Sequence, residues 1–222
     1  MISTFINTAI ITGIEPSASS FMDSSMMDFQ GLIDEARAQV VNFLKQQRKK
    51  IRLYCIPFSL DSQTLSGNYT GVKSLEDTIE RLIWVVNVTA GSGGFQLQGT
   101  NDETLETWNN VGSINVTATG TTTLYFDDPY KYYRVNYTGS SVTYTSYLIE
   151  KSFYYAHLYK SLQIIYNSFF MQKGDAFDIK RQYYKELYDA EIGSMAATYD
   201  EDDDGVVDDS ETVRVGQVIF SR

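Results

Sequence analysis

Apolar residues recur at helical spacing in two separate parts of the chain. In the first part, the stripe follows Ser25, a favourable helix cap with Asp28 three residues later. Its members are Phe29, Leu32, Ile33, Ala36, Val40, Phe43 and Leu44. This spacing predicts one amphipathic helix that ends near Gln47.

The second helical part covers residues 153–192 and is interrupted once, at Lys173 and Gly174. Gly174 can adopt the left-handed conformation that ends a helix. Asp175 is then placed to cap the next helix, with Asp178 three residues further on in a box-like position. Because the joint is so short, we expect two adjacent, antiparallel helices.

Between the two helical parts, the pattern changes to the period of two that is typical of strands. Short apolar runs alternate with turns rich in Gly, Asn and Asp, at the spacing of a sandwich. The predicted strands are Ile51–Pro57, Arg81–Thr89, Gly94–Gly99, Gly112–Ala118, Thr121–Phe126, Tyr132–Tyr137 and Val142–Glu150. The sequence therefore predicts an α+β fold, with a β-sandwich inserted into a bundle of three main helices.

This pattern divides the chain into a series of segments, of which the helical one is discontinuous. Both termini predict extended arms, because the first shows little periodicity and the second begins with an Asp-rich run. Within the second arm, Thr212–Phe220 alternates as a strand does and has no obvious partner earlier in the chain. The segments are an N-terminal arm (1–24), a helical domain (25–50 and 151–195), the inserted sandwich (51–150) and the C-terminal segment (196–222).

The net charge of −10 argues against a general nucleic-acid binder, whose affinity comes from neutralising phosphates. The basic cluster between Lys45 and Lys50 either complements the helix dipole or forms a local binding site. Cys55 is the only cysteine, which excludes an intrachain disulfide, and its apolar neighbours suggest a buried side chain. The N-terminus lacks a signal peptide or membrane span, so we expect synthesis in a cytoplasm and no membrane partner.

The sharpest local motif is an acidic run that matches the twelve-residue calcium loop. Glycine stands at its sixth position, and strand-like sequence follows in place of the exiting helix of an EF-hand. The run is either a structural calcium site or a solvated acidic linker. The predicted ligands are the side chains of Asp200, Asp202, Asp204, Asp208 and Glu211 and the backbone carbonyl of Val206.

No other motif points to catalysis, and we expect no enzymatic activity. His157 is the only histidine and lies within a predicted helix, where a lone histidine is usually structural. The sequence has no Gly-rich phosphate loop, no nucleophile elbow and no paired histidines.

The inserted segment contains a series of short motifs with aromatic and polar residues. It contains Trp84-Val-Val-Asn-Val, then Phe95-Gln-Leu-Gln-Gly-Thr-Asn-Asp, then Trp108 and Tyr132-Tyr-Arg-Val. This rhythm resembles a discoidin-like jelly roll, some relatives of which bind sugars. We expect both tryptophans to pack in the core or between sheets. Arg134 faces opposite to its neighbours and either pairs with a carboxylate such as Asp102 or faces solvent.

The arrangement as a whole resembles the head–tail connectors of tailed bacteriophages, the adaptor or head-completion family. One part of the resemblance is the first helix, Asp34-Glu-Ala-Arg-Ala-Gln-Val-Val-Asn-Phe-Leu, after a polar arm. The later pair, Tyr159-Lys-Ser-Leu-Gln-Ile-Ile-Tyr and Phe177-Asp-Ile-Lys-Arg-Gln-Tyr-Tyr-Lys-Glu-Leu-Tyr, and the Asp-rich loop before a C-terminal arm complete it. The resemblance covers about half of the chain, and the inserted sandwich departs from the shortest family members.

This resemblance implies a virion protein made in the host cytoplasm and placed at the head–tail junction, or neck. It implies a ring, commonly twelve-fold, between the portal protein and a downstream tail or stopper protein, with DNA passing through the lumen without specific binding. The C-terminal arm would dock on the portal or a neighbouring subunit by strand addition. Its apolar contacts would come from Val213, Val215, Val218, Ile219 and Phe220.

A rival interpretation treats the chain as a binding module. A discoidin-like insert on a helical stalk suits recognition of a surface glycan, as in an accessory protein of a phage tail.

Overall fold

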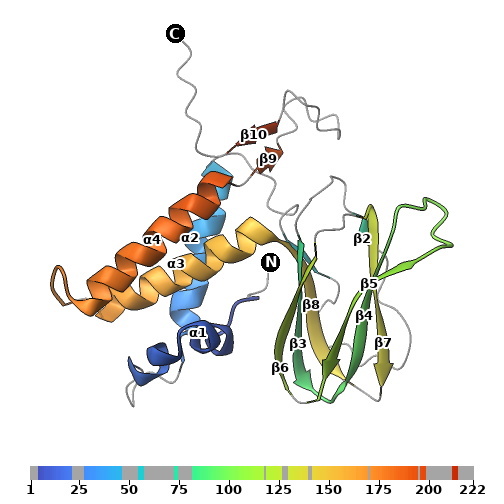
Figure 1. The fold of residues 1–222 in the computed structure, drawn as a ribbon, viewed down its shortest axis with the longest axis horizontal. Coiled ribbons are helices and arrows are strands. Elements are labelled where there is room, and N and C mark those ends of the chain that lie inside the picture. The colour runs from blue at the N-terminus through green and yellow to red at the C-terminus, as the bar shows by residue number, and fades with distance from the viewer. Residues whose placement is uncertain are drawn as a thin grey trace, which may run out of the picture. The chain divides into compact units, whose positions relative to one another are not determined.

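The computed structural model describes residues 5–21, 28–46, 55–57, 73–74, 82–117, 119–126, 130–139, 142–169, 171–194, 196–198 and 212–214. Its elements are helices and antiparallel strands, which confirms the predicted α+β class (Figure 1). The chain divides into two compact units. The helical unit comprises Met1–Ile51 and Ser152–Arg222, and the sandwich unit comprises Arg52–Lys151.

The helical unit has four α-helices among the described residues, where the sequence predicts three main ones. The additional helix lies in the segment predicted to be an extended arm, and a 3-10 helix follows it. The elements are α1 (Thr8–Ile14), η1 (Pro16–Phe21), α2 (Gln30–Gln46), α3 (Lys151–Phe169), α4 (Ala176–Ser194), β9 (Ala196–Thr198) and β10 (Thr212–Arg214).

The prediction of an extended N-terminal arm is therefore wrong for the described residues of that segment. Asn7 caps α1, because its side-chain oxygen accepts the N–H of Ile10 at 3.0 Å. Ile6 and Ile11 are fully buried, and the Phe5 ring packs edge-on against His157 at 5.0 Å. Burial of these scattered apolar residues against later helices gives this segment its structure, which local periodicity does not reveal.

Helix α2 begins at Gln30, five residues after the predicted cap, Ser25, which lies outside the described residues. Asp28 takes over the capping role, because its carboxylate accepts the N–H of Gln30 at 2.9 Å. The predicted apolar stripe is confirmed in the interior, where the buried members include Ile33, Ala36, Val40 and Leu44.

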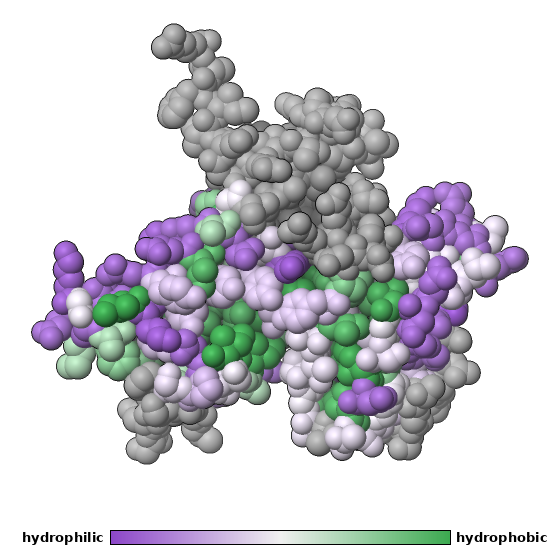
Figure 2. Space-filling view, viewed as in Figure 1, coloured by the Kyte–Doolittle hydropathy of each residue, from purple (hydrophilic) through white to green (hydrophobic). Residues whose placement is uncertain are grey.

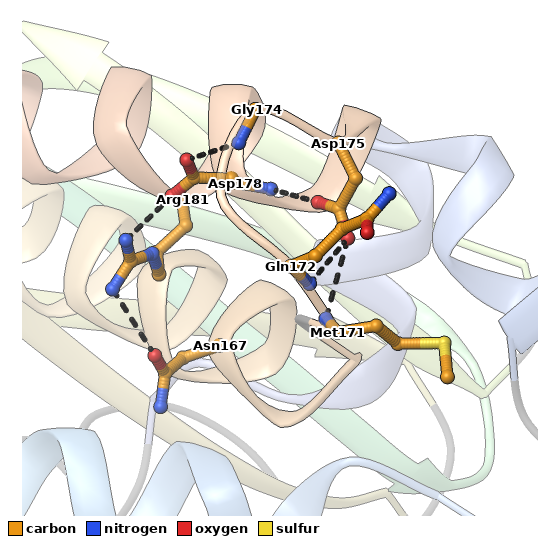
Figure 3. Close-up of polar contacts among 7 residues, drawn as sticks. All are labelled: Asn167, Met171, Gln172, Gly174, Asp175, Asp178 and Arg181. Atoms are coloured by element: carbon orange, nitrogen blue, oxygen red, sulfur yellow. Dashed lines mark hydrogen bonds and ion pairs between the residues drawn. The ribbon is translucent and has the colours of Figure 1, made fainter.

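The turn between α3 and α4 matches the sequence prediction closely (Figure 3). Gly174 is left-handed, with φ of +85°. Asp175 accepts the N–H of Asp178 at 2.7 Å, and Asp178 accepts the N–H of Gly174 at 2.8 Å, which resembles a capping box except that the second bond reaches the residue before the cap. Asp178 also pairs with Arg181 at 2.5 Å, and Arg181 reaches Asn167 on α3. The angle between the two helices is therefore held by polar contacts at the turn.

The sandwich unit consists of two four-stranded antiparallel sheets, in the orders β1-β8-β3-β6 and β2-β7-β4-β5. The central pairs are long: Leu82 lies opposite Glu150 in the first sheet, and Thr100 lies opposite Tyr132 in the second. The strands are β1 (Cys55–Pro57), β2 (Lys73–Ser74), β3 (Leu82–Ala90), β4 (Gly93–Thr100), β5 (Asn109–Val116), β6 (Gly120–Phe126), β7 (Tyr132–Gly139) and β8 (Thr143–Glu150).

Alternate residues of these strands form the sandwich core. Trp84, Tyr133, Tyr137, Tyr144 and Phe95 are its largest members, and all are essentially inaccessible to solvent. The indole N–H of Trp84 donates to the Ser146 hydroxyl at 2.8 Å, so the one polar edge of this side chain is satisfied within the unit.

Candidate functional site

Helix α3 lies between the two other long helices of the helical unit, α2 and α4. On one side, His157 of α3 donates from Nε2 to the carbonyl of Ile33 on α2, at 3.1 Å. On the other side, the Tyr166 ring of α3 stacks on Tyr184 of α4, with centroids 5.8 Å apart. These two α3 residues are nine positions apart, which is about two and a half helical turns. Helices α2 and α4 therefore contact opposite sides of α3.

The carboxylate of Glu15, the residue after α1, binds two side chains of α4 and so fixes the position of that helix. It is buried, and it accepts hydrogen bonds from the hydroxyls of Tyr184 and Tyr166, the latter at 3.1 Å. Lys180 of α4 completes the cluster with an ion pair of 2.6 Å. A single carboxylate thus joins the N-terminal segment to α3 and α4.

The charges of this cluster stabilise one another. Burial alone would raise the pKa of Glu15, but the hydrogen bonds from Lys180 and Tyr184 outweigh it and hold the pKa below its ordinary value. The same carboxylate raises the pKa of Lys180. Burial, with the hydrogen bond to Glu15, raises the pKa of Tyr184. The cluster is therefore a neutralised, satisfied network, which favours a structural role over proton transfer.

The side of α4 that points away from α3 is exposed and unusual in composition. One row of its exposed residues has the spacing 3-4-3-4-3, the heptad pattern of helix–helix contact, and exposed Gln182, Lys185 and Asp189 lie beside it. Ile179 is 63% exposed and Tyr183 is 53% exposed, although both are large apolar side chains. We call this row the α4 outer face; its members are Ala176, Ile179, Tyr183, Glu186, Ala190 and Gly193.

The α4 outer face is partly apolar, and polar contacts fix the helix that carries it. The Asp175 cap holds its first turn, and Glu15 holds its middle through Lys180 and Tyr184. At the adjoining turn, Met171 is 87% exposed. In the view of Figure 2, apolar surface lies over the N-terminal part of α4 within mostly hydrophilic surroundings. An exposed apolar row on a helix fixed in this way has the physical character of a protein-contact surface.

The predicted calcium ligands, Asp200 to Glu211, lie outside the described residues, so the site remains a prediction. No three His, Cys, Asp or Glu side chains in the described part of the chain gather in a way that could hold a metal ion. The strands on either side of the acidic run do pair with each other: Thr198 lies opposite Thr212. The two strands that flank the run in sequence, β9 and β10, are therefore neighbours.

The same pairing corrects the prediction for the C-terminal strand. β10 was expected to have no partner within the chain, yet it pairs antiparallel with β9, with Val213 opposite Ala197. Three-residue strands carry little sequence signal, which is why β9 was missed. The other residues predicted to contact a partner, Val215, Val218, Ile219 and Phe220, lie outside the described residues.

The two tryptophans of the sandwich lie in different environments. Trp84 belongs to the core, as predicted, whereas Trp108 is only half buried and lies under the guanidinium of Arg134, 4.1 Å from its ring centroid. Arg134 also donates to Gln98 at 2.8 Å. The sequence left two alternatives for Arg134, pairing with a carboxylate such as Asp102 or facing solvent, and the structure places it against Trp108 and Gln98.

Asp102 instead organises the loop before Trp108. Its carboxylate accepts from the backbone and hydroxyl of both Thr104 and Thr107, at 2.6–3.1 Å, and these bonds hold its pKa well below the usual range. Leu105, at the tip, has φ of 59°, which is uncommon for a residue with a side chain. The indole N–H of Trp108 donates to the Leu105 carbonyl at 2.9 Å. The tip is thus held in a defined conformation.

His157 is completely buried, and burial lowers its pKa to about 4. Its position between α2 and α3 agrees with the structural role expected of it. Sequence reasoning missed two features, Glu15 and the α4 outer face. The heptad spacing from Ala176 to Gly193 was the available signal for the second; Glu15 gave none.

No helix among the described residues combines the length and apolar character needed to cross a membrane.

Comparison with known proteins finds no matching family model and no matching curated protein. A mitogen from Yersinia pseudotuberculosis is similar in structure, with 11% identity, a TM-score of 0.31, and coverage of 43% of this chain and 84% of that one. PirA is similar at 14% identity and a TM-score of 0.28, over 43% of this chain and 91% of that one. Likenesses this weak carry no argument about function.

Proposed function

We propose that this chain is a structural subunit of an oligomeric ring between the portal and the tail of a tailed bacteriophage. The observation that carries the proposal is the α4 outer face, where Ile179 and Tyr183 are exposed at heptad spacing on a helix fixed by polar contacts. Assembly through preformed surfaces requires such a row, because an ordered apolar surface loses little entropy when a partner covers it. The sequence resemblance to connectors supplies the identity of the assembly.

The C-terminal segment gives the proposal its docking device. β9 follows α4 after one residue, and β10 pairs back onto β9. The last described strand, β10, is therefore tied through β9 to the end of α4. In the proposed mechanism the C-terminal arm lies along the portal, and Val215, Val218, Ile219 and Phe220 supply its apolar contacts.

A structural calcium ion in the acidic run would rigidify the base of this arm. The pairing of Thr198 with Thr212 supports the idea, because a calcium loop needs its first and last ligands close together. Isothermal titration of calcium into wild type and Asp204→Ala tests it: we expect heat from wild type and much less from the variant. An absence of heat with wild type would exclude the calcium site.

The inserted unit is, in this proposal, a discoidin-like jelly roll, in keeping with its two four-stranded antiparallel sheets. The net charge of −10 suits a ring around DNA, because a negative lumen repels the phosphates and lets the DNA slide.

Immuno-electron microscopy of phage particles that carry this chain tests the proposed location. We expect label at one site, the junction of head and tail, on intact particles or on heads and tails that have been separated. Antibody blocked with the purified chain serves as the control. Label confined to fibres or the tail tip, or absent from every particle fraction, would overturn the connector proposal.

A second candidate, recognition of a surface glycan, is favoured by one observation on the sandwich. Gln96, Gln98, Arg134 and Asn136 share the outer face of paired strands β4 and β7, beside Trp108. Such positions form a grid of roughly 5 by 7 Å, close to the size of a sugar ring. A glycan array probed with the full chain and with Trp108→Ala tests it: binding by the full chain that is lost in the variant would support this candidate.

A further inference from the structure

We infer that the α4 outer face of one subunit packs against the outer face of α2 in the next subunit. The inference rests on the proposed ring and names the partner of the surface that carries it: a second copy of this chain, presenting a different helix. The argument depends on the placement, the side-chain sizes and the charges of these two helices.

The outer face of α2 has its own exposed row. Gly31, Glu35, Ala38 and Asn42 are exposed at the spacing 4-3-4, while the opposite side of the helix is buried in the unit. A side-chain carbon added at Gly31 would meet nothing within 4 Å, so this end of the row is open. The α2 outer face, defined by these four residues, thus repeats the heptad pattern of α4 with smaller side chains.

The two rows are complementary in size. The α4 outer face carries two large exposed side chains, Ile179 and Tyr183, separated by one turn. The α2 outer face offers Gly31 and Ala38, which leave shallow gaps between their neighbours. Large side chains fitting between small ones are the basis of knobs-into-holes contact between helices. Two α4 outer faces would instead bring large side chains to both helices.

The charges favour a parallel contact between the two helices. After Asp178 in its first turn, α4 carries the cations Lys180, Arg181 and Lys185, each also in an ion pair within the subunit, and then the anions Glu186, Asp189 and Glu191. In α2 the order is reversed, because the anions Asp34 and Glu35 precede the cation Arg37. Parallel packing therefore places opposite charges side by side.

The fold of the helical unit makes a parallel contact available. Helices α2 and α4 contact opposite sides of α3, so their outer faces point away from each other. Figure 1 shows that they run in the same general direction. A neighbour related by a modest rotation about a ring axis would therefore present its α2 roughly parallel to α4. Contacts between two different faces continue from subunit to subunit, as a ring requires.

Cysteine cross-linking of the full chain tests the contact. In a Cys55→Ser background, Ala38→Cys and Tyr183→Cys are made separately and mixed, then oxidised and run on a denaturing gel. A disulfide needs the two α-carbons within about 7 Å, so only a close helix contact gives a product. We expect a cross-linked dimer from the mixture and none from either variant alone. A chain with both substitutions is expected to give a ladder of oligomers.

The matched control pairs Ala38→Cys with Tyr125→Cys, an equally exposed aromatic position on the sandwich, and is expected to give no product. Cross-linking of Tyr183→Cys alone would overturn the inference, because it indicates a twofold α4 contact. No product from the mixture, when particles show the chain at the head–tail junction, would overturn the inference and leave the proposed function standing. Cross-linking without label at the junction would retain self-assembly and remove the connector.

Discussion

The two units of this chain are stabilised by different kinds of interior. The sandwich is filled by apolar and aromatic side chains, and the buried indole of Trp84 finds its partner in Ser146. The helical unit instead buries ionisable groups at its joints: Glu15 beside α4, His157 beside α2, and Asp178 at the α3–α4 turn. The helical unit therefore gains specific geometry together with sensitivity to mild acid through its buried His157, and no such group lies in the described core of the sandwich.

The largest effect is expected from emptying the sandwich core. Trp84→Ala should lower the free energy of unfolding of the sandwich by about 3–5 kcal/mol, since it leaves a cavity and an unpaired Ser146. Denaturant unfolding followed by Trp108 fluorescence measures it within the same unit. Trp108→Ala, followed through Trp84, is the matched control, and a loss there as large as for Trp84→Ala would contradict the assignment of the core.

Mild acid should distinguish the two units next. The pKa of His157 falls from 6.5 to about 4 on folding, so the unfolded chain binds a proton more tightly between these values. The stabilisation is complete above pH 6.5 and is lost as the pH falls toward 4, by up to about 3 kcal/mol. Helical circular dichroism during denaturant unfolding at several pH values should show this loss, while Trp108 fluorescence should not.

The variant His157→Asn checks the cause of the pH response. It removes the titrating group, so the pH slope between 6.5 and 4 should flatten, whatever the variant does to absolute stability. A slope that is unchanged in the variant would assign the response to another group. The pKa values of Glu15 and Asp178 are also lowered, but their effects appear only below their ordinary values of 4.5 and 3.8.

A somewhat smaller loss is expected from Glu15→Ala. The substitution leaves the buried hydroxyls of Tyr166 and Tyr184 without their acceptor, which should cost the helical unit about 2 kcal/mol. Lys180→Met is the matched control, because Lys180 is 43% exposed and its ion pair is screened by water, so its loss should stay below about 1 kcal/mol. Thermal unfolding followed by helical circular dichroism measures both, and equal effects would contradict the assigned role of the carboxylate.

The smallest change in stability is expected from replacing single glycines by alanine. Gly13→Ala in α1 should stabilise the helical unit by about 0.5 kcal/mol, because a Cβ there meets nothing within 4 Å. Gly93→Ala in the sandwich should destabilise, because its Cβ would overlap the ring of Tyr137. Differential scanning calorimetry of the two variants gives opposite signs if the space around each glycine decides the outcome.

The sequence predicted those parts of the fold whose cause is local. Gly174, Asp175 and Asp178 lie within five residues, and the turn they predict is present in detail. The N-terminal segment was misjudged because its structure depends on distant partners: Glu15 bonds to a tyrosine 169 residues later. No periodicity within residues 1–24 could indicate such a contact.

The candidate surface was only partly visible in the sequence. In the sequence of α4, apolar residues that face inward alternate with apolar residues that face outward. The sequence alone therefore does not distinguish the two rows, whereas the structure shows that Tyr184 is buried and Tyr183 is exposed. The partner of β10 was hidden for a different reason, since its pairing with β9 depends on backbone hydrogen bonds more than on side-chain pattern.

The insertion of the sandwich between α2 and α3 has a consequence for synthesis on the ribosome. The sandwich is contiguous in sequence and can fold as soon as it emerges, whereas α2 must wait for α3. The roughly 100 intervening residues take about 5–20 s to translate, and α2 lacks its contacts with α3, such as that of Ile33 with His157, during that time. The helical unit is thus the first to be started and the last to be completed, and its folding on the ribosome must wait for the end of the chain.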